Sequence, residues 1–400
     1  MKTLFKTISA LVLLLTFQPG TAQLVFEPIT GFSPVPPLVE DQPIAVQSNK
    51  IQVVFALDVT GSMGSLIHAA KDKIWTISNS LKQSNANLSV EIGIVAYRDR
   101  GDAFVTKIVD LNSNFDQVFS ELNALTADGG GDEPESVNQA LHDAVKKISW
   151  GHAPNDLRTI FLIGDCPPHM DYRNDVKYQK SCEEARQKDI VINTIQMGNR
   201  PSTESVWREI ADLANGEYNA TDMNVNQVVI STPFDEEIKR KSMELEQSRT
   251  FYGSASEQEE AAKDVATRLE VTSTMSTETA ARRADYMINA TDDVQQYGEN
   301  ELIQAVRNGN VNIAEVAEED LPAELKDLST DERVEKVNVM VNERIEQEKE
   351  LEELIEKRDQ YVITNVDVNA ASGSFTNTVL SNLGTQAKKK NITLSDKAKY

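Results

Sequence analysis

One short stretch of the chain, VVFALDVTGSMGS at residues 53–65, joins a continuous run of apolar side chains to a polar turn. The apolar part is typical of a strand that is buried on both faces. Oxygen-bearing side chains then follow at every second position, at Asp58, Thr60 and Ser62. Because alternate side chains of an extended turn point the same way, we expect these three groups to face one ligand.

Strands and helices alternate along the chain from residue 50 to about residue 221. The expected strands are apolar runs at residues 51–57, 88–97, 103–111, 157–164, 190–198 and 217–221. The expected helices have apolar side chains at helical spacing, at residues 64–83, 114–125, 137–149, 175–189 and 203–215. This pattern predicts an α/β fold in which helices cover both faces of a mostly parallel sheet.

A second aspartate, Asp165, directly follows the strand expected at residues 157–164. Right-handed crossovers allow this strand to lie beside the one that ends at Asp58, and parallel sheets bind ligands at the carboxyl ends of their strands. The two carboxylates and the hydroxyls of Thr60 and Ser62 would then present only oxygen to one crevice. Such a set suits Mg²⁺ first, with Mn²⁺ or Ca²⁺ as alternatives, and does not suit zinc or copper. Four groups leave a coordination position open for water or for a carboxylate from outside.

Four motifs in this order resemble those of von Willebrand factor A (vWA) domains. They are DVTGSM at residues 58–63, VAYRDRGD at 95–102, GGGDEPES at 129–136 and GDCPPH at 164–169. The resemblance covers about residues 49–232 and implies a Rossmann-like fold. It also implies a metal-ion-dependent adhesion site (MIDAS), where a divalent cation is held by Asp58, Thr60, Ser62 and Asp165. A protein ligand would complete the coordination with an acidic side chain.

The loop before the helix expected at residues 137–149 departs from the family's pattern, because no threonine stands at its tip. The loop reads TADGGGDEPESV, residues 126–137, and Asp132 occupies the nearest matching place. We therefore expect Asp132 as a further metal ligand, with Glu135 at the helix start or behind the ligands. An aspartate at this place makes the site more anionic and weakens its demand for an external carboxylate.

Other polar side chains near these motifs are expected to have structural roles. Arg98 and Asp99 would brace the metal loop, and His169 would be a structural histidine. Cys166 and Cys182 fall in one expected loop–helix unit, so we expect a disulfide between them, with two buried thiols as the alternative.

The strand pattern stops near residue 232, and residues 233–400 are expected to form a helical C-terminal region with a polar tail. Helices are expected at residues 233–253, within 256–269, at 292–309 and at 374–390. The clearest helical pattern lies within residues 321–362 and begins near Thr330. Its apolar face consists of Val334, Val337, Val341, Ile345, Leu351, Ile355 and Val362. We expect this segment to be a solvated helical hairpin, with a partner surface as the alternative.

The N-terminus has the features of a secretory signal peptide over residues 1–22. Two lysines precede an apolar run at residues 8–17, and small side chains precede an expected cleavage after Ala22. The apolar run is too short to span a bilayer. A Pro-rich linker is expected at residues 23–48. Because no later stretch reads as a transmembrane segment, we expect an exported protein, secreted or periplasmic.

The charge balance narrows the choice of partners. The chain has 63 acidic and 40 basic side chains, which gives a formal net charge of −23. No basic surplus is available to neutralise phosphates, which argues against nucleic acid and against anionic membrane surfaces.

Together these features favour a binding module rather than an enzyme. We expect an exported vWA-domain protein that binds a divalent cation at a MIDAS-type site and mediates protein–protein interaction or adhesion. One alternative is a haloacid-dehalogenase-like phosphohydrolase that uses Asp58 as nucleophile, although Thr60 stands where such an enzyme needs its general acid. The other is a structural or assembly component of the cell envelope that acts through the helical region.

Overall fold

The computed structural model describes residues 50–64, 67, 75–81, 88–131, 133–221, 230–290, 296–365 and 375–394. Residues Ser48–Tyr400 form one compact unit. The expected signal peptide and Pro-rich linker lie outside the described residues. Within the described residues, no helix has both the length and the apolar character needed to cross a bilayer.

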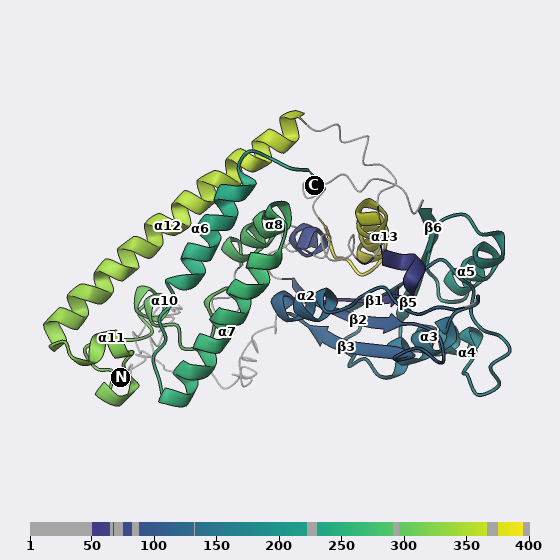
Figure 1. The fold of residues 1–400 in the computed structure, drawn as a ribbon, viewed down its shortest axis with the longest axis horizontal. Coiled ribbons are helices and arrows are strands. Elements are labelled where there is room, and N and C mark those ends of the chain that lie inside the picture. The colour runs from purple at the N-terminus through teal and green to yellow at the C-terminus, as the bar shows by residue number, and fades with distance from the viewer. Residues whose placement is uncertain are drawn as a thin grey trace, which may run out of the picture. The chain divides into compact units, whose positions relative to one another are not determined.

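A six-stranded sheet in the order β3-β2-β1-β4-β5-β6 forms the centre of the first half of the chain (Figure 1). Its strands are β1 (Lys50–Asp58), β2 (Ser89–Tyr97), β3 (Thr106–Asn112), β4 (Leu157–Gly164), β5 (Ile190–Met197) and β6 (Tyr218–Thr221). All neighbouring pairs are parallel except β2 and β3. The expected mostly parallel sheet is therefore confirmed.

Both faces of the central strand β1 are buried, which explains its continuous apolar sequence. Val53, Phe55 and Leu57 point into one core, and Val54 and Ala56 point into the core on the opposite face. Alternate side chains of a strand leave opposite faces of the sheet, so a strand covered on both sides needs apolar residues at every position.

Helices from separate parts of the chain cover the two faces. The helices α3 (Val137–Lys146), α4 (Tyr178–Gln187) and α5 (Pro201–Leu213) bury one face. The helix α2 (Phe115–Asn123) contributes to the core on the other face.

The C-terminal region is helical, as expected. Its elements are α6 (Asp235–Gln247), α7 (Ala255–Thr274), α8 (Thr277–Ile288), α10 (Leu302–Arg307), the 3-10 turn η2 (Glu318–Asp320), α11 (Ala323–Lys326), α12 (Thr330–Asn365) and α13 (Phe375–Lys389). The helix expected over residues 292–309 is shorter where it is described. Gly298 and Asn300 have positive φ angles of 96° and 55°, which end regular helix geometry before α10 begins.

The helix α12 is one continuous helix of 36 residues, so the expected hairpin is wrong. It begins at Thr330 as predicted, where the side chain of Glu332 accepts hydrogen bonds from Ser329. Figure 1 shows it running beside α6.

The buried stripe of α12 includes three charged side chains that the predicted apolar face omits, Arg344, Glu348 and Arg358, and it leaves out Ile345. Ile345 is 41% exposed, and the neighbouring Arg344 is buried in its place. The Arg344 guanidinium lies 3.2 Å from a carboxylate oxygen of Glu301. Because this partner comes from another segment, the buried arginine could not be recognised from the periodicity of apolar residues.

The last described helix, α13, returns to the sheet rather than belonging to a polar tail. Phe375, Val379 and Leu383 join the same core as β1 and α2. On its polar side, Gln386 accepts a hydrogen bond from Thr159 of β4 and donates one of 2.8 Å to Asn193 of β5. The expected helix at residues 374–390 is confirmed, but its role is to close one face of the sheet.

The helix α8 also contacts the sheet's covering layer. Arg283 of α8 donates two hydrogen bonds to Asp116 of α2, of 2.6 and 2.7 Å. Both side chains are buried. Burial favours the neutral acid, but the charge and hydrogen bonds of Arg283 outweigh it and hold the pKa of Asp116 below its ordinary value.

The expected disulfide is absent, because Cys166 and Cys182 are free and buried. Cys166 accepts a hydrogen bond from Arg200 at 3.6 Å, and the thiol of Cys182 lies 3.7 Å from the carbonyl of Ile210. Burial raises the pKa of both thiols. The two cysteines are therefore inert thiols with separate partners.

We expect Leu383→Ala to lower the free energy of unfolding by about 2–5 kcal/mol, because the substitution leaves a cavity between α13 and the sheet. Urea unfolding checks this value. The control Lys388→Ala changes an exposed residue of the same helix and should stay within about 0.5 kcal/mol of the wild type. Equal effects of the two substitutions would contradict the placement of α13.

We expect Asp116→Asn to cost on the order of 3 kcal/mol at pH 7, because it leaves the buried Arg283 without its charge partner. A carboxylate with a lowered pKa contributes stability above its ordinary pKa, and this contribution is lost as the pH falls through the lowered value. The gap between wild type and variant should therefore narrow below about pH 4. Urea unfolding at several pH values measures it. The control Glu121→Gln removes an exposed carboxylate from α2, and a gap that did not change with pH would refute the role of the ion pair.

Candidate metal centre

Asp58 is the last residue of β1, and its carboxylate is buried. Its Oδ1 accepts two hydrogen bonds from Thr60, from the backbone N–H at 2.9 Å and from the hydroxyl at 2.6 Å. The hydroxyl of Thr60 lies 3.4 Å from that of Ser62. Thr60 is buried and Ser62 is exposed. The turn therefore brings the three predicted side chains together, with the serine toward solvent.

The second oxygen of Asp58, Oδ2, is buried without a hydrogen-bond partner. Burial raises the pKa of Asp58 to about 7, although the two bonds from Thr60 oppose this shift, and the nearby charge of Asp165 adds to it. A buried carboxylate oxygen without a partner is costly, which makes it a candidate for contact with a cation.

Asp165 stands directly after β4, which pairs with β1 in a register that sets Leu57 opposite Ile163. Its backbone carbonyl accepts a hydrogen bond from Thr203 at 2.9 Å, which ties this turn to α5. Its Oδ1 is also buried without a partner. The expected meeting of Asp58 and Asp165 at neighbouring strand ends is therefore confirmed.

Gly164 gives Asp58 the space that its carboxylate occupies. A Cβ atom at this position would lie 2.9 Å from Asp58 Oδ2 and 2.5 Å from the hydroxyl of Tyr97. A larger residue at the end of β4 would therefore displace the carboxylate.

The glycine-rich loop packs against the same turn. The N–H of Gly61 donates to the carbonyl of Gly129 at 3.1 Å. Gly130 has a φ of 73°, and a Cβ there would lie 2.9 Å from Thr60 Cβ. The loop thus approaches the site as expected. Asp132 lies outside the described residues, so its role as a ligand stays a prediction.

Glu135 is a third buried carboxylate beside the site, and one of its oxygens has no partner. Burial, together with the charges of Asp58 and Asp99, raises the pKa of Glu135 to about 9. Its N–H donates to the carbonyl of Pro167, which fixes it against the loop after β4. The sequence analysis placed Glu135 near the helix start, which is correct. It did not predict that the charges of Asp58 and Asp99 would raise the pKa of Glu135.

The bracing roles expected for Arg98 and Asp99 agree with their contacts. Arg98 donates to the carbonyl of Thr126 at 2.8 Å, at the start of the glycine-rich loop. Asp99 accepts hydrogen bonds from Ser136 at 2.8 Å and from Tyr172 at 2.7 Å. These bonds tie the loops around the site to one another.

His169 is buried and stacks on the ring of Tyr172, with ring centroids 4.0 Å apart. Its Nδ1 lies 2.8 Å from Asp171, and its Nε2 lies 3.4 Å from Asp99. These contacts agree with the structural role expected for it.

The donor chemistry of the site suits a hard cation. Two unpartnered carboxylate oxygens lie beside two hydroxyls, and no lysine or arginine in the described part of the chain forms an ion pair with Asp58 or Asp165. Within that same part of the chain, no group of three or more His, Cys, Asp or Glu side chains is arranged to hold a metal ion. Of the predicted ligands, only Asp58 and Asp165 are carboxylates within the described residues. The others are the hydroxyls of Thr60 and Ser62, and Asp132.

Comparison with known proteins gives the family of this part of the chain. The family model for the von Willebrand factor A domain matches residues 52–224. Von Willebrand factor A domain-containing protein 7 of Rattus norvegicus is 38% identical over 114 residues, which are 28% of this chain and 12% of that protein. Alpha-protein kinase vwkA of Dictyostelium discoideum is 29% identical over 132 residues, which are 30% of this chain and 19% of that protein. The chain therefore spans less than a fifth of the length of each of these two relatives.

A solved structure, the conserved hypothetical protein BatB from Bacteroides thetaiotaomicron, is also similar. It is 16% identical and matches 44% of this chain and 90% of that chain, with a TM-score of 0.32. The assignment rests on the family model, the order of the strands and the four motifs. Domains of this family serve in general in protein–protein interaction or adhesion. Residues 52–224 of this chain are a von Willebrand factor A domain.

Proposed function

We propose that the protein is an exported interaction protein whose vWA domain binds a divalent cation, Mg²⁺ first, and there captures an acidic side chain of a protein partner. The proposed ligands are Asp58, Thr60, Ser62 and Asp165. The observation that carries the proposal is the pair of buried, unpartnered oxygens, Asp58 Oδ2 and Asp165 Oδ1, on residues at the ends of two neighbouring parallel strands.

The electrostatics of the site support a cation. Burial and the nearby charge of Asp165 both disfavour the ionised form of Asp58, and no lysine or arginine of the described residues forms an ion pair with it. A bound divalent cation supplies the missing positive charge. Asp58 and Asp165 would hold it directly, and the Thr60 hydroxyl orients Asp58 by its hydrogen bond.

The exposure of Ser62 supports partner capture. Asp58, Thr60 and Asp165 are buried, so a cation at the site is approached from the side of Ser62. An incoming carboxylate would complete the coordination there. Asp132, if it also binds, would reduce the need for this outside carboxylate.

Export is a separate part of the proposal. It is supported by the signal-like composition of residues 1–22. Partners are accordingly proposed among proteins of the cell surface, the periplasm or the medium.

The phosphohydrolase alternative remains open to a direct test. Thr60 stands where such an enzyme needs its general acid, and its hydroxyl donates a hydrogen bond to Asp58. This arrangement does not support acid catalysis next to Asp58. Turnover of a generic phosphate ester that Asp58→Ala abolishes would favour this alternative over the binding module.

We expect Mg²⁺ to raise the melting temperature of the full chain, with a gain of about 2.7 kcal/mol at a concentration one hundred times the Kd. Asp58→Asn should abolish this gain. Without metal at pH 8, the variant should be at least as stable as the wild type, because it keeps the acceptor for Thr60 and removes a buried charge. A carboxylate with a raised pKa loses stability as the pH rises from about 4 to about 7, so this penalty is complete at pH 8.

Differential scanning fluorimetry with Mg²⁺, Mn²⁺ and Ca²⁺ measures these shifts. The matched control is Asp171→Asn, which removes an exposed carboxylate after β4 and should keep the full response to metal. An equal response in the wild type and Asp58→Asn would place the cation elsewhere.

We expect Ser62→Ala to weaken capture of a partner by tenfold or more at about 1 mM Mg²⁺, because it removes the exposed ligand beside the open position. The measurement is a pull-down from native medium or envelope, quantified by mass spectrometry, with and without chelator. Partners lost both on chelation and in Ser62→Ala belong to the cation site. Partners that are retained in both cases would support the helical region as the interaction surface.

A further inference from the structure

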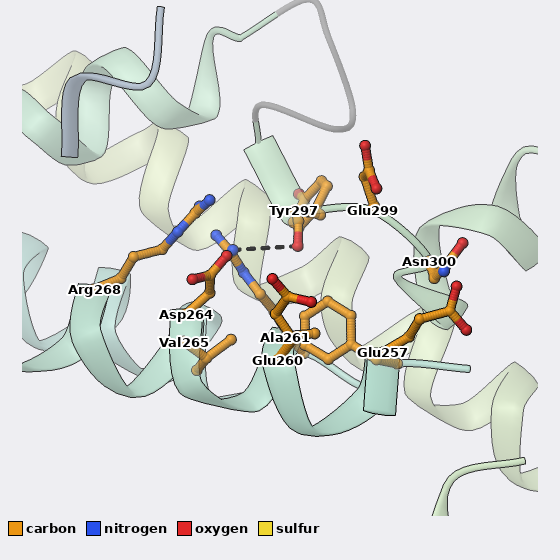
Figure 2. A pocket seen from close by; sticks show the side chains of 12 residues that line it. Glu257, Glu260, Ala261, Asp264, Val265, Arg268, Tyr297, Glu299 and Asn300 are labelled. Carbon is orange, nitrogen blue, oxygen red and sulfur yellow. Dashed lines mark hydrogen bonds between the residues drawn. The ribbon is translucent and has the colours of Figure 1, made fainter. Parts of the chain in front are cut away.

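A cavity of about 240 Å³ lies beside α7 in the helical region (Figure 2). Figure 2 shows Glu257, Glu260, Asp264 and Arg268 in one row along α7, on the side that faces the segment carrying Tyr297 and Glu299. Their spacing of three or four residues places them on one face of the helix. The cavity is separate from the cation site, and the inference below does not depend on the proposed function.

Two guanidiniums, those of Arg249 and Arg268, line the cavity. Together with Arg283, which does not line it, they form ion pairs with two buried carboxylates, Asp116 and Glu246. Arg283 binds Asp116 with two hydrogen bonds, and Arg249 lies 2.9 Å from Glu246. Among these five side chains of the described structure, three guanidiniums therefore share two carboxylates.

The pKa of Arg249 reflects this crowding of guanidiniums. Burial lowers it to about 10, the charge of Glu246 opposes this shift, and the charges of Arg268 and Arg283 add to it. Such crowding of guanidiniums is relieved by an additional anion.

Of the three arginines, Arg268 has the weakest ion pair. Its Nε lies 4.0 Å from Asp116, which Arg283 already occupies, and its guanidinium donates no hydrogen bond to any described residue. The side chain is 11% exposed, and its Nη1 is buried without a partner. Arg268 and Asp264 also line a neighbouring cavity of about 420 Å³ against α2. A guanidinium held in this way is a ready partner for a carboxylate.

The rim of the same cavity has the opposite charge. Glu260, Asp264 and Glu299 line it, are exposed, and form no ion pair among the described residues. Glu257 is already used, because it accepts hydrogen bonds from Ser254 at the start of α7. Phe251 adds an apolar surface to the wall. The cavity therefore offers two guanidiniums, an acidic rim and two aromatic rings, those of Phe251 and Tyr297.

We propose that this cavity binds a small zwitterion, a free α-amino acid, with its carboxylate on Arg268 and its ammonium group at Asp264 and Glu260. Each charge of such a ligand meets the opposite charge, and its side chain lies along Phe251. A phosphate or a dicarboxylate would bind Arg268, but it carries no positive charge and would be repelled by the acidic rim. An amine or a divalent cation would bind the acidic rim, but it would supply no anion to the Arg268 guanidinium.

The test is a thermal-shift screen of the full chain with the twenty common amino acids at about 10 mM, followed by calorimetric titration of those that stabilise it. At least one amino acid should raise the melting temperature. Arg268→Gln and Asp264→Asn should each weaken its binding by about tenfold or more, because each removes one charge-assisted contact. Lys263→Gln and Glu259→Gln remove exposed charges from the same helix outside the cavity and should bind as the wild type does.

Analogues of the amino acid that binds separate the two charged contacts. The deaminated acid should bind more weakly than the amino acid in the wild type, and this difference should disappear in Asp264→Asn. The decarboxylated amine should be insensitive to Arg268→Gln. Failure of all twenty amino acids to stabilise the wild type would overturn the proposal, as would equal affinities of the wild type and Arg268→Gln. Asp264 is exposed, so Asp264→Asn should fold. This variant therefore tests the proposal even if Arg268→Gln fails to fold.

Discussion

The parallel pairing of β1 with β4 is the constraint on which the candidate metal centre depends. Its register sets Leu57 opposite Ile163, so the two strands end at the same edge of the sheet and their aspartates follow at adjacent turns. Gly164 leaves the room that the Asp58 carboxylate fills. The pairing therefore brings the charge of Asp165 near the buried carboxylate of Asp58, and one oxygen of each carboxylate has no hydrogen-bond partner in the described structure.

The loops around this edge are built to hold that geometry. The turn after β1 and the glycine-rich loop are joined by the hydrogen bond between Gly61 and Gly129, and Asp99 ties the loop after β2 to Ser136 and Tyr172. Glycines at positive φ allow the close approach of backbone to Thr60. The geometry of the candidate site thus rests on backbone packing as much as on the side chains of Asp58, Thr60 and Ser62.

The helical region is part of the same compact unit as the sheet. The final helix α13 buries Phe375 and Leu383 against the face that also receives α2, and Arg283 of α8 neutralises Asp116. One face of the vWA sheet is therefore covered by α13, a helix that follows α6 to α12 in the sequence. Removal of everything after residue 232 would open this core, so the two halves of the chain are not independent in stability.

The sequence by itself determined the alternation of strands and helices, the mostly parallel sheet and the positions of Asp58, Thr60, Ser62 and Asp165. The strands and the turn from Asp58 to Ser62 are local features, because a strand buried on both faces needs a continuous apolar run and the turn has its residues close in sequence. Asp165 was placed beside them from the expected order of the parallel strands. Asp132 was also chosen from sequence and lies outside the described residues.

Tertiary structure alone decided the features that depend on partners far apart in the chain. Arg344 is buried where Ile345 was expected, because Glu301 supplies its counter-charge. The cysteines stay free because Cys166 faces Arg200 and Cys182 faces Ile210. The periodicity of a sequence indicates which face of a helix is apolar. It does not indicate which side chain from a distant segment contacts that face, so these contacts could be found only from the tertiary structure.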